Sequence, residues 1–246
     1  MSRNGKALPL NELDRELAPW ISVQEDLNQV VRWSVFLRRR PSVRRQTSTQ
    51  HTLGLALMMK NVIGRSGLES SLDVGLLLSA CIVHDIPEGV LRRDVLYNNK
   101  SQASDVAEYK AFLRLFKEHG WSTLSFQQAY LLQFCLKDYS RFPREAQVIM
   151  SDLSMTCRRE AQFFDFVERY DYLVYAWEQY RQKKNVRVAM HVLGNQIPKL
   201  RALVEALPCL GMVWSPKLDR DMQTFVDQHE DQMKKPRRTK VSRSTK

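Results

Sequence analysis

Apolar residues recur every three to four positions over long stretches of this chain, and this periodicity constrains the fold more than any other feature. Such spacing gathers apolar side chains on one face of an α-helix. Glycine and proline number only nine each, so few positions interrupt the pattern. The sequence therefore predicts an all-α fold, with helices at 22–38, 49–65, 70–84, 102–119, 124–136, 144–182, 184–206 and 217–233.

The distribution of charge and of helix-breaking residues divides the 246 residues into four parts. We expect an N-terminal extension at 1–20, one helical domain at 21–210, a helical annex at 211–233 and a basic tail at 234–246. The net charge is +11, and the tail alone holds seven Lys and Arg residues and no acid. A segment so poor in apolar residues is predicted to be disordered. It is either solvated without a specific partner, a nuclear import signal or a weak contact for nucleic acid.

Neither a membrane nor an oxidising compartment is indicated by the composition. The longest apolar run, at 74–83, is far shorter than the roughly 20 residues that span a bilayer. The N-terminal residues lack the apolar segment of a signal peptide. The four cysteines form no Cys-x-x-Cys pair, which is typical of free cysteines in a reducing compartment. We therefore expect a cytoplasmic or nucleoplasmic protein without membrane association.

A His-Asp pair, His84 and Asp85, directly follows the most apolar segment of the chain. A helix that is hydrophobic all round is buried, so this pair is expected at the inner end of a buried helix. An unpaired buried carboxylate costs several kcal/mol, and a divalent cation would satisfy both side chains at once. Alternatively, the pair ends the helix in water and binds nothing.

A second histidine, His51, follows the segment Thr47-Ser-Thr, whose hydroxyls can cap the first turn of a helix. The helices that contain His51 and His84 are consecutive and joined by a short turn, so they are expected to pack as antiparallel neighbours. Asp152 is the candidate for a further acidic ligand because it lies in a mostly apolar stretch. Asp165 and Asp171 are weaker candidates.

The order His51, His84-Asp85, Asp152 resembles the H…HD…D signature of the HD-domain superfamily of metal-dependent phosphohydrolases. The segments 45–53 and 84–94 resemble those of the subgroup that contains bacterial 5′-deoxynucleotidases. The similarity covers roughly residues 25–185. This chain has Gln50 where the subgroup usually has a glutamate.

The resemblance implies a single HD-domain helical bundle, a homodimer and one bound divalent metal ion, which is Mn, Co, Fe, Ni, Zn or Mg. It implies four metal ligands, His51, His84, Asp85 and Asp152. It also implies catalytic roles for Glu88 and Asp94. Glu88 shares a helical face with the His-Asp pair, where it could orient water or handle a proton. Alternatively, Glu88 only forms an ion pair with the arginines of the following loop.

Five arginines lie within the eight residues 38–45, just before His51. Guanidinium groups bind phosphate bidentately, so this cluster is a candidate phosphate site. The subgroup has one arginine before its first histidine, and three residues here are candidates for the substrate phosphate: Arg38, Arg39 and Arg40. Alternatively, the cluster is a solvated basic loop.

The sequence therefore predicts an enzyme, a metal-dependent phosphohydrolase that releases phosphate from a nucleotide by means of metal-activated water. Its expected partner is a nucleotide or another small phosphate ester. One alternative is a hydrolase of phosphodiesters or nucleoside triphosphates at the same site. Another is a non-catalytic module that binds nucleotides or nucleic acid.

Overall fold

A computed structural model of the chain describes residues 10–33, 36, 45–94, 100–120 and 123–234. Helices dominate the described residues, and their only strands form a two-stranded sheet, so the predicted all-α fold is confirmed. The chain forms two compact units, residues 1–168 and 169–246. The boundary between these two units lies inside a helix. The division into 1–20, 21–210, 211–233 and 234–246 stays a prediction. Residues 235–246 of the predicted tail and Arg38, Arg39 and Arg40 lie outside the described residues.

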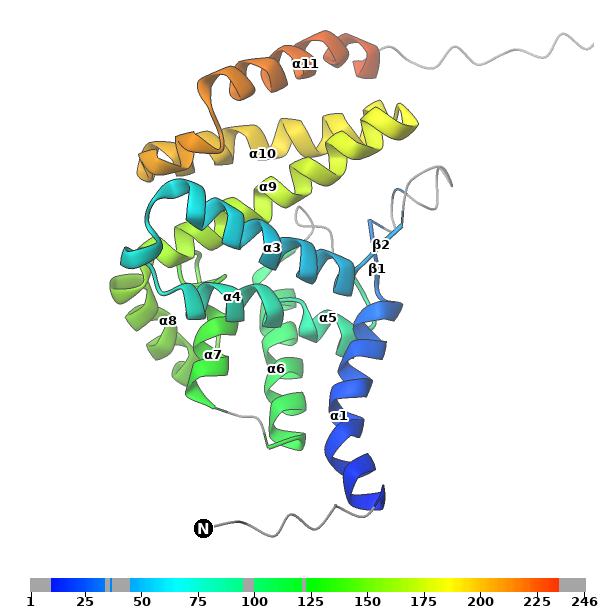
Figure 1. The fold of residues 1–246 in the computed structure, drawn as a ribbon, viewed down its shortest axis with the longest axis vertical. Coiled ribbons are helices and arrows are strands. Elements are labelled where there is room, and N and C mark those ends of the chain that lie inside the picture. Colours follow the sequence, from blue (N-terminus) through cyan, green and yellow to red (C-terminus); the bar gives the residue numbers. More distant parts are fainter. Residues whose placement is uncertain (1–9, 34–35, 37–44, 95–99, 121–122, 235–246) are drawn as a thin grey trace, which may run out of the picture. The chain divides into compact units, whose positions relative to one another are not determined.

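The first unit contains the two strands and the helices that precede residue 169 (Figure 1). In chain order they are α1 (Leu10–Gln29), β1 (Val31–Arg32), β2 (Gln46–Thr47), α3 (Ser48–Ser66), η1 (Glu69–Ser71), α4 (Val74–Val83), α5 (Ile86–Leu91), α6 (Gln102–Glu118), α7 (Leu124–Leu131), α8 (Arg144–Thr156) and the first part of α9 (Arg158–Lys183). The second unit consists of the rest of α9, α10 (Val186–Ala206), η2 (Pro208–Met212) and α11 (Pro216–Lys234).

Two predicted helices differ from the observed ones in ways that local sequence does not reveal. The helix predicted at 22–38 ends at Gln29, and the chain then forms β1, which pairs antiparallel with β2. Trp33, next along the chain, has a φ of 63°, which a helix does not allow. The helix predicted at 144–182 is broken at Cys157, where neither glycine nor proline marks the break.

Helix α4 forms the centre of the first unit, where it packs against both α3 and α7 (Figure 1). Gly67 ends α3 with a φ of 70°, and the short turn that follows makes α3 and α4 run antiparallel, as the sequence predicts (Figure 1). At the start of α4, the Asp73 carboxylate accepts a hydrogen bond of 2.8 Å from the Leu76 amide. The Asp73 amide donates to Glu160 of α9 at 3.0 Å. The start of α4 is therefore fixed. Its C-terminal end leads to His84, whose amide donates a hydrogen bond of 3.1 Å to the Ala80 carbonyl oxygen.

One described segment, Val74–Leu91, is long and apolar enough to cross a membrane by composition, with a mean hydropathy of 1.5. Half of this segment is buried within the protein. It contains two helices, α4 and α5, with the His-Asp pair between them. The core helix of a protein that does not enter a membrane can have the same apolar composition, so this segment is weak evidence for a membrane span.

We expect the substitution Leu77→Ala to lower the free energy of unfolding by about 2–5 kcal/mol, because Leu77 is fully buried on α4 and its loss leaves a cavity. The matched control is Ile82→Ala on the same helix, because Ile82 is 54% exposed. Its effect should stay within about 0.5 kcal/mol. Urea denaturation measures both, and equal losses would show that α4 is not the centre of the core.

Candidate metal centre

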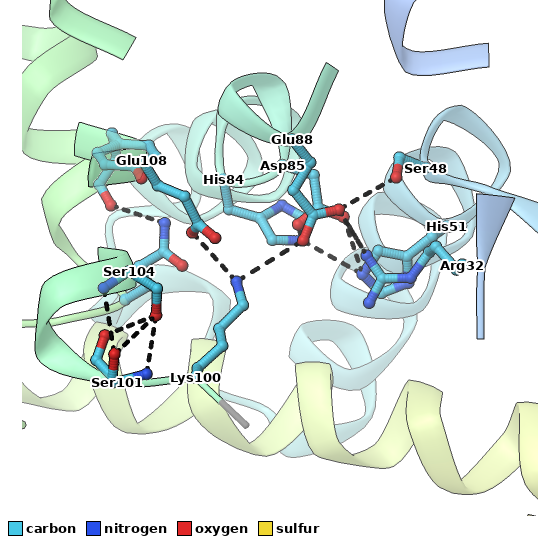
Figure 2. A network of polar contacts seen from close by, with 12 residues as sticks. Arg32, Ser48, His51, His84, Asp85, Glu88, Lys100, Ser101, Ser104 and Glu108 are labelled. Atoms are coloured by element: carbon cyan, nitrogen blue, oxygen red, sulfur yellow. Dashed lines mark hydrogen bonds and ion pairs between the residues drawn. The ribbon is translucent and has the colours of Figure 1, made fainter. Parts of the chain in front are cut away.

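Three side chains from two neighbouring helices converge in the first unit (Figure 2). His51 lies in the first turn of α3, and His84 and Asp85 join α4 to α5. All three are buried, and one potential ligand atom of each lies within 4.8 Å of the other two. This group could hold a metal ion.

The first turn of α3 is fixed by a capping box, which orients His51. The Thr47 hydroxyl accepts a hydrogen bond of 3.3 Å from the Gln50 amide, and the Gln50 side chain accepts one of 3.1 Å from the Thr47 amide. Glutamate and glutamine both serve in this motif, which accounts for Gln50 beside His51. The predicted capping of this helix by hydroxyl groups is confirmed.

The protonation of His84 leaves one ring nitrogen available to a metal ion. Its Nδ1 lies 2.8 Å from the Cys81 carbonyl oxygen, which can only accept a hydrogen bond, so Nδ1 holds the proton. Burial lowers the pKa of His84, against the opposing charge of Asp85, so the ring is neutral at neutral pH. The Nε2 atom therefore presents a lone pair to the cluster.

The Asp85 carboxylate is ionised although it is buried. Burial opposes its ionisation, but the positive charges around it, with Arg32 among them, hold its pKa well below the usual value. The Arg32 guanidinium forms a buried ion pair with Asp85 Oδ2. Asp85 is thus available as an anionic ligand next to the neutral His84.

The separations of the ligand atoms fit one divalent cation. His51 Nε2 lies 3.2 Å from His84 Nε2, and His84 Nε2 lies 3.2 Å from Asp85 Oδ1. His51 Nε2 lies 3.7 Å from Asp85 Oδ2. Ligand atoms about 2.0–2.1 Å from a tetrahedral ion lie roughly 3.3 Å from one another. Two imidazoles and a carboxylate suit Zn and the other first-row divalent metals.

Glu88, one turn past Asp85 in the sequence, is buried beside this cluster. Its Oε2 accepts a hydrogen bond of 3.2 Å from the Ser48 hydroxyl and lies 3.5 Å from Arg32 Nη1. Burial first, and then the charge of Asp85, raise its pKa well above the usual value. The raised pKa favours the protonated form of this carboxyl group, and a positioned carboxyl group can transfer a proton.

The other predicted site residues lie in different places. Asp94 Oδ2 accepts a hydrogen bond of 2.8 Å from the Trp33 amide, which links it to the turn after β1. Asp152 is exposed on α8, and the structure does not bring it to the three clustered ligands. The acid of α9 whose charge acts on His84 is Glu168, which the sequence did not single out.

Several residues of the site carry no sequence signal. Arg32 reaches Asp85 because β1 pairs with β2, immediately before α3, with Arg32 opposite Gln46. Lys100 Nζ lies 3.7 Å from Glu88 Oε1 and 3.2 Å from Glu108 Oε2. These contacts join residues far apart in the chain, so no local motif marks them.

Comparison of the chain with protein-family models, with curated proteins and with solved structures found no match.

We expect isothermal titration of the metal-stripped chain with Zn²⁺ or Mn²⁺ to show one tight site. The substitution Asp85→Asn should weaken metal binding by roughly 100-fold or more. Mutating a residue that only hydrogen-bonds to a metal ligand already lowers metal affinity by about 10–100-fold, and Asp85 is a proposed ligand itself. Asp152→Asn is the matched control and should leave the affinity unchanged. Equal losses in both variants would instead make Asp152 a ligand, and no loss in Asp85→Asn would contradict this cluster as the metal site.

Proposed function

We propose that the chain is a metal-dependent phosphohydrolase that releases phosphate from a nucleotide or a similar phosphomonoester. The observation that supports this most is the buried His51–His84–Asp85 group with Arg32 and Glu88 beside it. The order of His51 and the His84-Asp85 pair resembles the HD-domain phosphohydrolases. The similarity of segment 84–94 to the nucleotidase subgroup supports a nucleotide as substrate.

The concentration of buried charge favours a functional site over a structural one. Arg32, Asp85, Glu88 and Glu108 are all buried in one region of the first unit. Buried ion pairs are often no more stabilising than apolar side chains of similar volume, so they are weak contributors to stability. Clustered ionisable groups with shifted pKa values, next to two imidazoles, are typical of active sites.

In the proposed reaction, His51, His84 and Asp85 hold the divalent ion. When bound, that ion would polarise a phosphoryl oxygen and lower the pKa of water. Glu88, held by Ser48, accepts a proton from the attacking water and can return it to the leaving oxygen. Arg32 binds the phosphate with its planar guanidinium, and this contact replaces its contacts with the Asp85 and Glu88 carboxylates.

The proposal assigns to Arg32 the phosphate contact that the sequence assigns to Arg38, Arg39 or Arg40. Arg32 is the described arginine that contacts Asp85 and Glu88, whereas those three lie outside the described residues. Because Arg32 forms an ion pair with the proposed metal ligand Asp85, its guanidinium is within reach of a phosphate bound to the metal ion.

The test is phosphate release by the metal-stripped chain from nucleoside monophosphates, nucleoside triphosphates and a nitrophenyl phosphodiester, with Mn²⁺, Co²⁺, Zn²⁺ or Mg²⁺ added in turn. We expect at least one metal to restore release from monophosphates, and Asp85→Asn to abolish it without unfolding the chain. Turnover of only diesters or only triphosphates would move the assignment to those esters. Tight metal binding with no turnover of any ester would contradict an enzyme and favour a binding module.

Arg32→Lys tests the phosphate contact, because lysine keeps the charge but loses the planar fork. We expect kcat/KM for the monophosphate to fall by roughly 10- to 150-fold, the equivalent of about 1.5–3 kcal/mol for hydrogen bonds to a charged group. Arg92→Lys is the control, since Arg92 is exposed at the C-terminal end of α5. Unchanged kcat/KM in Arg32→Lys would remove Arg32 from the phosphate site.

A further inference from the structure

We propose that Lys100 is a positioning residue, which is anchored by Glu108 and holds the Glu88 carboxylate in its reactive orientation. The inference rests on the proposed function, in which Glu88 transfers a proton. It extends the site to α6, a helix that supplies none of the residues predicted from the sequence.

The backbone that bears Lys100 is fixed at the start of α6 (Figure 2). Lys100 immediately precedes Ser101, the N-cap residue of α6. The Ser101 hydroxyl accepts a hydrogen bond of 3.3 Å from the Ser104 amide, and the Ser104 hydroxyl accepts one of 2.8 Å from the Ser101 amide. This reciprocal pair holds the first turn, so the ammonium group extends from a defined position.

Different groups contact the two oxygens of the Glu88 carboxylate. Oε2 faces α3 and β1, where it meets the Ser48 hydroxyl at 3.2 Å and Arg32 Nη1 at 3.5 Å. Oε1 faces Lys100, whose Nζ lies 3.7 Å away. Contacts to Oε2 alone leave the carboxylate plane free to rotate. The ammonium group on Oε1 therefore fixes the plane, and it remains in place when Arg32 turns to a phosphate.

Glu108 holds the lysine from the opposite side. It is buried on α6, with Oε2 3.2 Å from Lys100 Nζ. Lys100 thus lies between two buried carboxylates, one on α5 and one on α6. A simpler explanation is that Lys100 only neutralises Glu108, since a buried carboxylate without a partner is strongly destabilising. That explanation makes its contact with Glu88 incidental, and a double substitution separates the two.

The experiment compares Lys100→Met, Lys100→Arg and the double variant Lys100→Met/Glu108→Gln, which leaves no buried Glu108 charge. Lys110→Met is the matched control, because Lys110 is exposed on α6, the helix that carries Glu108. Each variant is checked by thermal unfolding and by Zn²⁺ titration. The kcat and KM for phosphate release are then measured on the monophosphate that the unaltered chain turns over best.

We expect Lys100→Met to lower kcat by roughly 100-fold, a loss that misplacing a reacting group by about 1 Å can cause, with KM and metal affinity nearly unchanged. The double variant should stay as slow, and Lys100→Arg should recover part of the loss. Lys110→Met should match the unaltered chain. A double variant that regains kcat to within about threefold would overturn the proposal, and so would a loss confined to KM.

A second measurement needs no turnover and keeps the two proposals distinguishable. The carboxyl carbon resonance of Glu88 is identified in ¹³C-glutamate-labelled chain by its loss in Glu88→Gln. We expect it to shift in Lys100→Met and in the double variant, and to stay in place in Lys110→Met. If the unaltered chain hydrolyses no ester, the proposed function fails and this resonance alone decides. An unchanged Glu88 resonance in Lys100→Met then rejects the role of Lys100.

Discussion

The site depends on keeping the Asp85 carboxylate charged inside the protein. A buried carboxylate is costly, and here the ion pair with the Arg32 guanidinium offsets that cost. The position of the carboxylate in turn determines what can approach His51 and His84. A divalent cation between these three side chains would satisfy all of them at once, which links the electrostatics of the core to the proposed chemistry.

The surrounding helices supply the rigidity that such a group requires. Helix α4 is anchored at its start by the Asp73 cap and by Glu160, and it is buried against α3 and α7. Helix α3 starts with a capping box, so His51 projects from a fixed turn. His51 therefore projects from a capped first turn and His84 from the C-terminal end of an anchored helix, which suits a metal site that must keep its geometry.

The sequence predicts those features that depend on local pattern. The proximity of His51 to His84 and Asp85 is predicted from two consecutive helices that are joined by a short turn. The three side chains do converge in the structure. Arg32, Lys100 and Glu108 were not predicted, because they reach the site through a two-residue strand pairing and through α6, and pairing across the chain leaves no periodic trace. Asp152 was predicted to be a buried ligand because the stretch around it is mostly apolar, yet it lies on an exposed face of α8.

The central claim is that His51, His84 and Asp85 together bind a divalent cation. The most direct measurement is a crystal structure of the Mn²⁺-loaded chain, with anomalous diffraction to locate the metal. The account predicts one anomalous peak between the two Nε2 atoms and the Asp85 carboxylate, each about 2.0–2.3 Å away. A peak elsewhere, or Mn²⁺-soaked crystals with no peak among these residues, would contradict it.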